Sequence, residues 1–295
     1  MSAPNGHIVI TGVTGFIGAA LARRLHAEAR IVGLSRQGSR RDDWPVMQVD
    51  FCSAKSLRKL DKLKITMVVH LAAVKASGVE AETMAVNVAG TGTLLRYALA
   101  RGCRHFLVAS SIAAVGGLQP DFMPTALPIT EDYPCNARDP YGLSKWSMER
   151  LVDEHAPEFP DAGFTLLRLG SVVDESAWVP AGATSHEKMT FPFVELARVS
   201  RSDVVAALSV AIRSPPRAGV RTYNLVGPDA GCVEPVATVL KRHFGARLDG
   251  AMFARFAAKY GDCAPLYAME RIKHDLAFFP KQSLRGFQRP LPVLQ

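Results

Sequence analysis

Several signals that would assign a function at once are missing from this sequence. Its 295 residues include only five cysteines, which are scattered, odd in number and never spaced as Cys-x-x-Cys. This pattern argues against a disulfide framework and a cysteine-based zinc site, and it favours reduced thiols. The histidines show no metal-ligand spacing either, so we predict no metal.

Long apolar runs are also missing. A membrane-spanning helix requires about 18 consecutive apolar residues, and no such stretch occurs. A secretory leader has a basic segment followed by an apolar run, and residues 1–7 do not show this pattern. We therefore expect a soluble, cytoplasmic protein with no membrane partner.

Basic charge is in excess but not concentrated. The formal net charge is +8, yet no block of five or six Lys/Arg residues occurs and no nucleic-acid motif accompanies the charge. The excess is either a mildly basic surface or an attraction for an anionic small molecule or cofactor. We favour the small molecule and expect no nucleic-acid partner.

Short apolar runs alternate with helical patterns through the first half of the chain. This alternation predicts βαβ units, and hence an α/β fold with a doubly wound parallel sheet of the Rossmann type. Strands are predicted at His7–Thr11, Arg30–Leu34, Pro45–Asp50, Ile65–His70, His105–Ser110 and Phe164–Leu169. Helices are predicted at Phe16–Ala29, Glu80–Arg101 and Tyr141–His155.

Beyond Leu169 the alternation weakens, which predicts a small second lobe. We assign residues 1–173 to the Rossmann domain, with elements returning to it near 199–226, and residues 174–198 and 227–295 to a small C-terminal substrate-binding lobe. The predicted elements are a loop at Val173–Phe193, helices at Asp203–Ile212 and Val236–Phe244, a strand at Arg221–Val226 and an irregular tail from Phe278. Trp178, Met189, Phe191 and Phe193 either wall a pocket or, as we favour, pack in the lobe's core.

Glycines follow the first predicted strand at a spacing that suits phosphate binding. They permit a tight turn and a close approach of the backbone to a pyrophosphate, and the following helix N-terminus adds N–H groups and partial positive charge. An ordinary glycine-rich turn is the alternative, but a position at the first βα junction favours dinucleotide binding. The predicted contacts are Gly12, Thr14, Gly15, Phe16, Ile17 and Gly18.

In an NAD site, an acidic residue at the end of the second strand binds the ribose hydroxyls, and the second predicted strand has no acidic residue there. Arg36 lies there instead, placed to meet a 2′-phosphate, so we prefer NADP over NAD. Alternatively, Arg36 is a solvated turn residue. After the third strand, Asp50 and Phe51 are placed to flank the adenine, although Asp50 would serve equally as a strand-end cap.

Tyr141 and Lys145 are four residues apart at the start of a predicted helix, which puts them on one face. A lysine ammonium there favours phenolate and makes a tyrosine, which normally titrates near pH ~10, a proton donor and acceptor nearer neutrality. This spacing is common by chance. Together with the phosphate loop and with Ser110-Ser111 after the fifth strand, it predicts a proton-transfer site.

In combination these motifs resemble the extended short-chain dehydrogenases/reductases, and more narrowly the NAD-dependent epimerase/dehydratase family. The resemblance covers about the first 170 residues. It rests on the glycine spacing, His70-Leu71-Ala72-Ala73, Asn87-Val88-Ala89-Gly90-Thr91, Ser110-Ser111 and Tyr141-x-x-x-Lys145. It implies a homodimer formed through the predicted helices Glu80–Arg101 and Tyr141–His155.

The resemblance also implies catalytic roles. Tyr141 would be the acid/base, Lys145 would hold the nicotinamide ribose and lower the tyrosine pKa, and Ser111 would hydrogen-bond the reacting oxygen. A slip of one residue would exchange Ser111 for Ser110, because alternate strand residues face opposite sides. A strand-end cap is the other interpretation of Ser111.

Further cofactor contacts follow from the same resemblance. They are Leu71, Ala72, Ala73, Lys75 and Asn87. Lys75 is alternatively an exposed loop lysine, and Asn87 a polar helix residue with no cofactor role. His70 is expected to satisfy a buried hydrogen bond rather than to titrate in catalysis.

We expect an NAD(P)-dependent oxidoreductase that interconverts a ketone and a secondary alcohol of a small molecule. The alternative is a sugar epimerase of the nucleotide-sugar type that keeps its cofactor through each turnover. The region from Gly227 onward has only 69 residues, which is small for a lobe that fully encloses a sugar nucleotide. A cofactor-sensing regulator is less favoured, because Tyr141 and Lys145 are both present. The dehydratase branch is not expected, because no Thr-Asp-Glu triplet follows the serine strand.

Overall fold

The computed structural model describes residues 6–38, 43–75, 79–177 and 189–283. Within them, one seven-stranded parallel sheet has the order β3-β2-β1-β4-β5-β6-β9. Its strands are β1 (His7–Thr11), β2 (Ile31–Ser35), β3 (Val46–Gln48), β4 (Ile65–His70), β5 (His105–Ser111), β6 (Gly163–Leu169) and β9 (Gly219–Leu225). The predicted doubly wound sheet is confirmed.

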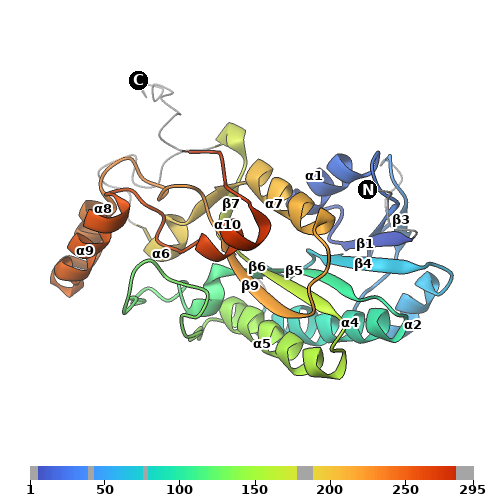
Figure 1. The fold of residues 1–295 in the computed structure, drawn as a ribbon. Coiled ribbons are helices and arrows are strands. Elements are labelled where there is room, and N and C mark those ends of the chain that lie inside the picture. The colour runs from blue at the N-terminus through green and yellow to red at the C-terminus, as the bar shows by residue number, and fades with distance from the viewer. Residues whose placement is uncertain (1–5, 39–42, 76–78, 178–188, 284–295) are drawn as a thin grey trace, which may run out of the picture.

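Helices cover both faces of this sheet (Figure 1). On one face α1 (Phe16–Leu25) packs beside α7 (Arg201–Arg213), and on the other α4 (Thr91–Ala100) packs beside α5 (Pro140–His155). The short α2 (Ala54–Leu57) packs against α4. No helix within the described ranges has the length and apolar character needed to cross a membrane.

The core has two layers, one on each face of the sheet, because successive side chains along a strand point to opposite faces. Ile8 and Ile10 join the apolar cluster that contains Leu21 of α1. Val9 lies between them in sequence but joins the cluster that contains Leu95 of α4. Burial on both faces explains why these strands are continuous apolar runs in the sequence.

The helix predicted at Glu80–Arg101 is interrupted in the structure. It comprises α3 (Glu80–Met84), a π-helical turn at Ala85–Gly90, and α4. Gly90 packs so closely on the segment after β3 that an added Cβ would lie 2.5 Å from Cys52 Sγ and 3.0 Å from the Phe51 ring. The predicted long helix is thus confirmed over residues 80–100, and the π-helical turn within it is a feature that periodicity does not reveal.

The later part of the chain is less regular than the first half and adds elements that the sequence did not predict. These are a two-stranded parallel sheet of β7 (Ser171–Val173) and β8 (Arg198–Ser200), and the helices α6 (Pro192–Glu195), α9 (Gly250–Tyr260) and α10 (Glu270–Leu276). The predicted helix at Val236–Phe244 is confirmed as α8, and α8 and α9 lie at the end of the molecule opposite β3 (Figure 1). Met189 and Phe193 are buried in the core, as favoured, whereas Trp178 lies outside the described residues.

Candidate active site

A pocket of about 660 Å³ lies where the loops after β1, β2, β4, β5 and β6 meet the start of α5. The carboxyl ends of parallel strands are where α/β folds bind ligands. The predicted site residues that line it are Gly12, Thr14, Gly15, Phe16, Ile17, Gly18, Arg36, Phe51, Leu71, Ala72, Ala73, Lys75, Ser111, Tyr141 and Lys145. Asp50 and Asn87 are not among its lining residues.

The glycine loop after β1 leaves no room for side chains. Gly12 has φ +67°, and a Cβ on it would lie 2.8 Å from the Ala72 nitrogen. A Cβ on Gly18 would lie 2.1 Å from the Gly12 carbonyl oxygen. Helix α1 begins after Gly15 with no side-chain cap and no acidic residue in its first turn. The backbone N–H groups of that turn are thus suited to an anion.

Tyr141 is brought to the pocket by the way α5 begins. The Asp139 side chain accepts a hydrogen bond from Gly142 N at 2.7 Å, and Pro140 occupies the first helical position. Gly142 lets the helix approach the chain after β5, since a Cβ there would lie 2.5 Å from Ala113 O. Tyr141 thereby comes within hydrogen-bond reach of Ser111.

The protonation of Tyr141 differs from the sequence-based expectation. Burial raises the pKa of Tyr141, as does the Asp139 carboxylate, and the hydrogen bond with Ser111 is what lowers it. Lys145 Nζ lies 5.8 Å from the tyrosine ring centroid, but it donates to the Ala109 carbonyl at 2.8 Å. Lys145 is not among the groups that shift the pKa of Tyr141, so the expected downward shift from this lysine is not found and desolvation raises the pKa instead.

Lys145 is itself buried. Burial lowers the pKa of Lys145 to about 8, while the nearby Glu149 carboxylate raises it. The ammonium is therefore retained below about pH 8 and lost above it.

The two serines at the end of β5 face different partners. Ser110 is buried, and its hydroxyl donates to Glu149. Ser111 accepts a hydrogen bond from Ala113 N at 3.1 Å and also bonds to Tyr141. Ser111 thus caps the short turn that follows and also contacts the tyrosine, so both interpretations of it fit the geometry.

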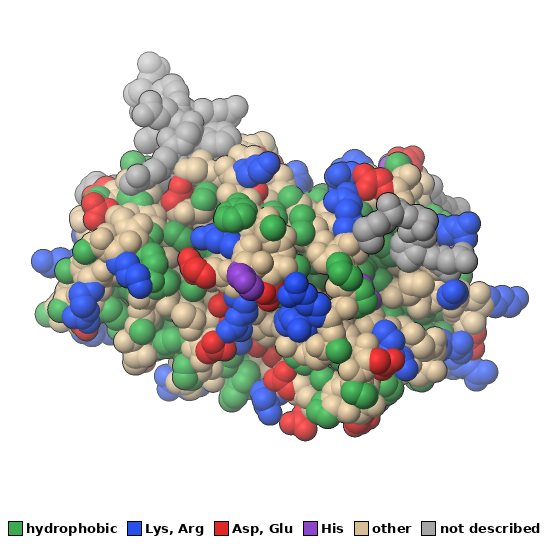
Figure 2. Space-filling view, viewed as in Figure 1, with side chains coloured by type: hydrophobic (Ala, Val, Ile, Leu, Met, Phe, Trp, Pro, Cys, Tyr) green, Lys and Arg blue, Asp and Glu red, His purple; other side chains and the backbone are tan. Residues whose placement is uncertain are grey.

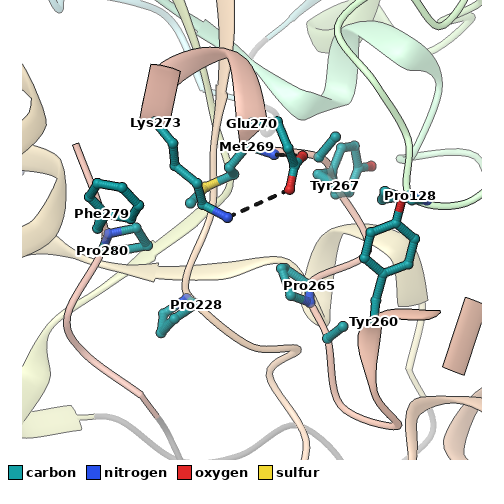
Figure 3. Close-up of a pocket in the computed structure, with 12 residues that line it drawn as sticks. Pro128, Pro228, Tyr260, Pro265, Tyr267, Met269, Glu270, Lys273, Phe279 and Pro280 are labelled. Atoms are coloured by element: carbon teal, nitrogen blue, oxygen red, sulfur yellow. Dashed lines mark hydrogen bonds and ion pairs between the residues drawn. The ribbon is translucent and has the colours of Figure 1, made fainter. Parts of the chain in front are cut away.

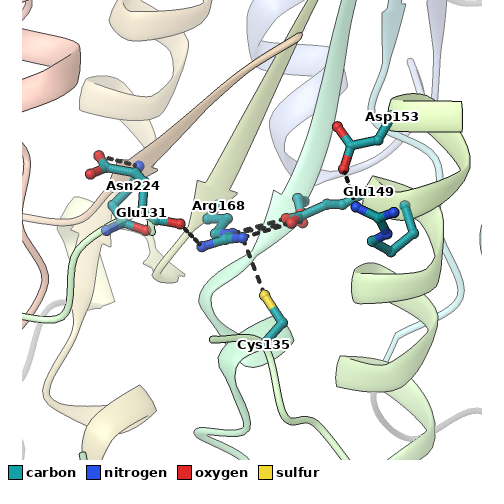
Figure 4. Close-up of polar contacts among 8 residues, drawn as sticks. Glu131, Cys135, Glu149, Asp153, Arg168 and Asn224 are labelled. Carbon is teal, nitrogen blue, oxygen red and sulfur yellow. Dashed lines mark hydrogen bonds and ion pairs between the residues drawn. The ribbon is translucent and has the colours of Figure 1, made fainter. Parts of the chain in front are cut away.

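A buried ion pair beneath the serines was missed by the sequence analysis (Figure 4). Arg168 of β6 donates to Glu149 of α5 through Nη2 at 2.8 Å and Nε at 3.0 Å, and both side chains are 6% exposed. Its Nη1 donates to the Glu131 carbonyl at 2.9 Å. Glu149 follows Lys145 by four residues, so helical spacing had placed it on the same face as Tyr141 and Lys145.

Asn87 and Asp50 have structural partners. The Asn87 side chain bonds both the N–H and the carbonyl of Val74, at 2.8 and 3.0 Å, and donates to Ser144 Oγ at 3.0 Å. It thus connects the chain after β4 to α5. Asp50 Oδ1 accepts from Cys52 N at 3.0 Å, which is the predicted cap alternative.

His70 also fixes the wall of the pocket. The Thr11 hydroxyl accepts from the backbone N–H groups of Leu71 and Ala72, so its own proton goes to His70 Nδ1 at 2.7 Å. His70 Nε2 then donates to Thr91 at 2.9 Å. Burial lowers the pKa of His70 to about 3, so the ring is neutral. The expected structural role of His70 is confirmed.

A second pocket, of about 350 Å³, shares no lining residue with the first (Figure 3). Phe279 and Pro280 lie on one side, Tyr260 and Pro128 lie on the other, and the Lys273–Glu270 pair, 3.6 Å apart, lies between them. The start of the predicted irregular tail thus lines this pocket. On the face shown in Figure 2, basic side chains are interspersed with acidic ones. In the described part of the chain no cluster of His, Cys, Asp or Glu could hold a metal.

Comparison with known proteins agrees with this arrangement. The profile of the NAD dependent epimerase/dehydratase family matches residues 8–205, more than half of the chain. The chain belongs to this family. The match spans the glycine loop, both serines and the Tyr141–Lys145 pair, so the resemblance inferred from these motifs is confirmed.

Curated members of the epimerase/dehydratase family resemble part of the chain. UDP-glucose 4-epimerase 2 of Arabidopsis thaliana is 26% identical over 183 residues, which are 60% of this chain and 51% of that protein. UDP-glucose 4-epimerase of Mycolicibacterium smegmatis is 34% identical over 156 residues, 48% of each chain. The chain thus matches about half the length of these relatives.

Solved structures share the fold over nearly all of the chain. A short-chain dehydrogenase/reductase superfamily protein from Agrobacterium tumefaciens with bound NAD has a TM-score of 0.68 at 22% identity, covering 94% of this chain and 93% of that one. The UDP-glucose 4-epimerase from Thermotoga maritima, with UDP-glucose, has a TM-score of 0.67 at 18% identity and covers 94% of each chain.

Proposed function

We propose that this chain is an NAD(P)-dependent epimerase acting on a nucleotide sugar. The observation that carries the proposal is that Tyr141, Ser111 and Lys145 line the same pocket as a glycine loop in which Gly12 and Gly18 have no room for a side chain. The names of the relatives favour this alternative over the net ketone–alcohol oxidoreductase that we first expected.

The residues of the pocket fit a dinucleotide. Gly12 and Gly18 leave only backbone where a pyrophosphate would lie, and the first turn of α1 faces it with N–H groups. Lys145 would hold the nicotinamide ribose. When bound, the nicotinamide supplies the hydride acceptor and donor.

Proton transfer falls to Tyr141. As a phenolate, it would take the proton of a sugar hydroxyl while Ser111 hydrogen-bonds the sugar oxygen, and as a phenol it would return the proton after the keto sugar has turned its other face. Burial raises the pKa of Tyr141, so the phenolate needs stabilising neighbours in order to form. Ser111 and the Lys145 ammonium would stabilise the phenolate when it forms.

For the cofactor we propose NADP binding, with NAD as the second choice. Arg36 lines the pocket at the end of β2, and the side chains at its neighbours Ser35 and Gln37 carry no negative charge. Replacing Arg36 with alanine is expected to raise the Kd for NADP about tenfold, because a charge-assisted bond to the 2′-phosphate is lost. The Kd for NAD should hardly change. Titration calorimetry with both dinucleotides measures this, and equal losses for the two would contradict the assignment.

Ser111 and Ser110 give a matched pair of variants. Ser111→Ala should lower kcat about a hundredfold, since one hydrogen-bond donor to developing charge is removed. Ser110→Ala should mainly lower thermal stability, because Ser110 is bonded to the buried Glu149. Steady-state kinetics and melting curves of both variants distinguish the two roles. A larger loss of kcat in Ser110→Ala than in Ser111→Ala would show that Ser110 is the catalytic serine.

The remainder of the chain would bind the substrate. We propose that residues 174–198 and 227–295 form the substrate-binding lobe, and that two copies associate through α4 and α5.

The proposed activity is tested by measuring whether the cofactor is consumed during the reaction. A set of nucleotide sugars is incubated with the chain and NAD or NADP, the products are identified by NMR, and reduced nicotinamide is followed by absorbance. Inversion at one carbon without net change in the cofactor is expected. Stoichiometric conversion of the cofactor would instead support the net oxidoreductase.

A further inference from the structure

Phe16, the first residue of α1, has an unusual neighbour. The ring lines the cofactor pocket but is 43% exposed, which is high for a large apolar side chain. The guanidinium carbon of Arg201 lies over it, 4.7 Å from the ring centroid. Arg201 begins α7, the helix that packs beside α1 (Figure 1). A cation in this position is attracted to the ring face.

Asp174 holds the same guanidinium. Arg201 Nη2 lies 2.8 Å from Asp174 Oδ2, and the two side chains are 33% and 30% exposed. Asp174 Oδ1 accepts hydrogen bonds from the Ser176 hydroxyl at 2.6 Å and from Ser176 N at 3.0 Å. These bonds, together with Arg201, lower the pKa of Asp174, so the carboxylate is charged at neutral pH. The arginine is therefore held between a fixed anion and an aromatic ring.

A second carboxylate ties the same segments together. Glu175 accepts a hydrogen bond from Ser202 N, in the first turn of α7, at 2.6 Å. The segment that carries Asp174 and Glu175 follows β7, whose Val172 lines the cofactor pocket. Three separate parts of the chain, at residues 16, 174–175 and 201–202, are thus joined beside the phosphate loop.

We propose that Asp174, Arg201 and Phe16 form a clasp that retains the dinucleotide in its pocket. The inference rests on the proposed function, because it presumes that a pyrophosphate lies at the glycine loop. Phe16 lines the pocket beside that loop, and Arg201, itself held by Asp174, fixes the ring there.

The clasp would act on the rate of cofactor release. A dinucleotide leaving the glycine loop would have to move past the Phe16 ring, which Arg201 and Asp174 keep in place. An epimerase returns its cofactor to the starting state within each turnover, so slow release costs it no activity.

Two substitutions test the clasp. Arg201→Met removes the charge and keeps an unbranched chain, and Asp174→Asn removes the anion that anchors the arginine. In each, release of the reduced dinucleotide that binds, NADPH or NADH, is followed by stopped-flow nicotinamide fluorescence. It is expected to accelerate roughly fivefold to tenfold, as suits the loss of an exposed cation–π contact and an exposed ion pair.

Arg213 provides the matched control. It lies on the same helix and also pairs with a surface carboxylate, Glu28, at 2.7 Å, but it does not contact Phe16. Arg213→Met should release the same reduced dinucleotide at the wild-type rate. A wild-type rate in Arg201→Met or in Asp174→Asn would overturn the clasp alone. Failure of the wild-type chain to bind either dinucleotide would overturn the proposed function and the clasp with it.

Discussion

Replacing Tyr141 with phenylalanine is expected to lower kcat by a factor of about 10²–10⁴, the usual contribution of a positioned acid/base. The variant loses the phenol oxygen that Ser111 bonds, and no other titratable side chain among the pocket-lining residues lies in hydrogen-bond contact with Ser111. Binding of NAD and NADP should persist, since the ring remains in place. Steady-state kinetics and calorimetry on the same preparation measure both quantities.

Tyr97 supplies the control for this experiment. Its hydroxyl donates to the Asp61 carboxylate at 2.8 Å, and it does not line the cofactor pocket. Tyr97→Phe also removes one phenol hydrogen bond, and it should leave kcat at the wild-type value. If Tyr141→Phe kept wild-type turnover, the proton would have to pass through another group and the catalytic assignment would be wrong.

Replacing Glu149 with alanine is expected to lower the free energy of unfolding by about 3–5 kcal/mol, because it leaves a buried guanidinium without its carboxylate. Arg168 would keep only the Glu131 carbonyl and Cys135 Sγ as partners. The carboxylate that raises the pKa of Lys145 would also be lost, so the pKa of Lys145 should fall further. Urea unfolding followed by circular dichroism gives the stability change.

Glu154 is the control that compares the buried ion pair of Glu149 with an ordinary surface ion pair. This residue is on the same helix, is 77% exposed and pairs with Arg150 at 3.3 Å. Glu154→Ala should cost no more than about 0.5 kcal/mol. The double replacement of Glu149 and Arg168 by methionine should cost less than Glu149→Ala, since no charge is left unpaired. Equal losses for Glu149→Ala and Glu154→Ala would contradict the account.

Local sequence signals predicted the parts of the site that are built from neighbouring residues. The bounds of β1 and β4 were predicted as observed, because each is an apolar run that ends where the chain turns. The glycine loop and the Tyr141–Lys145 pair were also predicted, since each lies within about one helical turn of its partners. Asp50 and Asn87 make the hydrogen bonds that their structural alternatives require, and their cofactor contacts stay predictions.

Other parts depend on tertiary contacts that no local pattern contains. Arg168 meets Glu149 only because β6 pairs with β5, against which α5 packs, and Arg201 reaches Phe16 from far along the chain. The raised pKa of Tyr141 follows from burial, which spacing alone does not give. By contrast, α9 had a usable signal that was missed: Asp249 caps it, and Met252, Phe253 and Phe256 form its buried face.

The central claim is that the inverting carbon exchanges a hydride with the cofactor while Tyr141 handles only the oxygen-bound proton. Running the epimerisation in deuterium oxide and analysing the product by NMR and mass spectrometry tests this most directly. The account predicts an inverted sugar with no solvent deuterium on the inverted carbon, since its hydrogen travels through the nicotinamide. Incorporation of solvent deuterium at that carbon would show that a proton is removed from it, and would contradict the account.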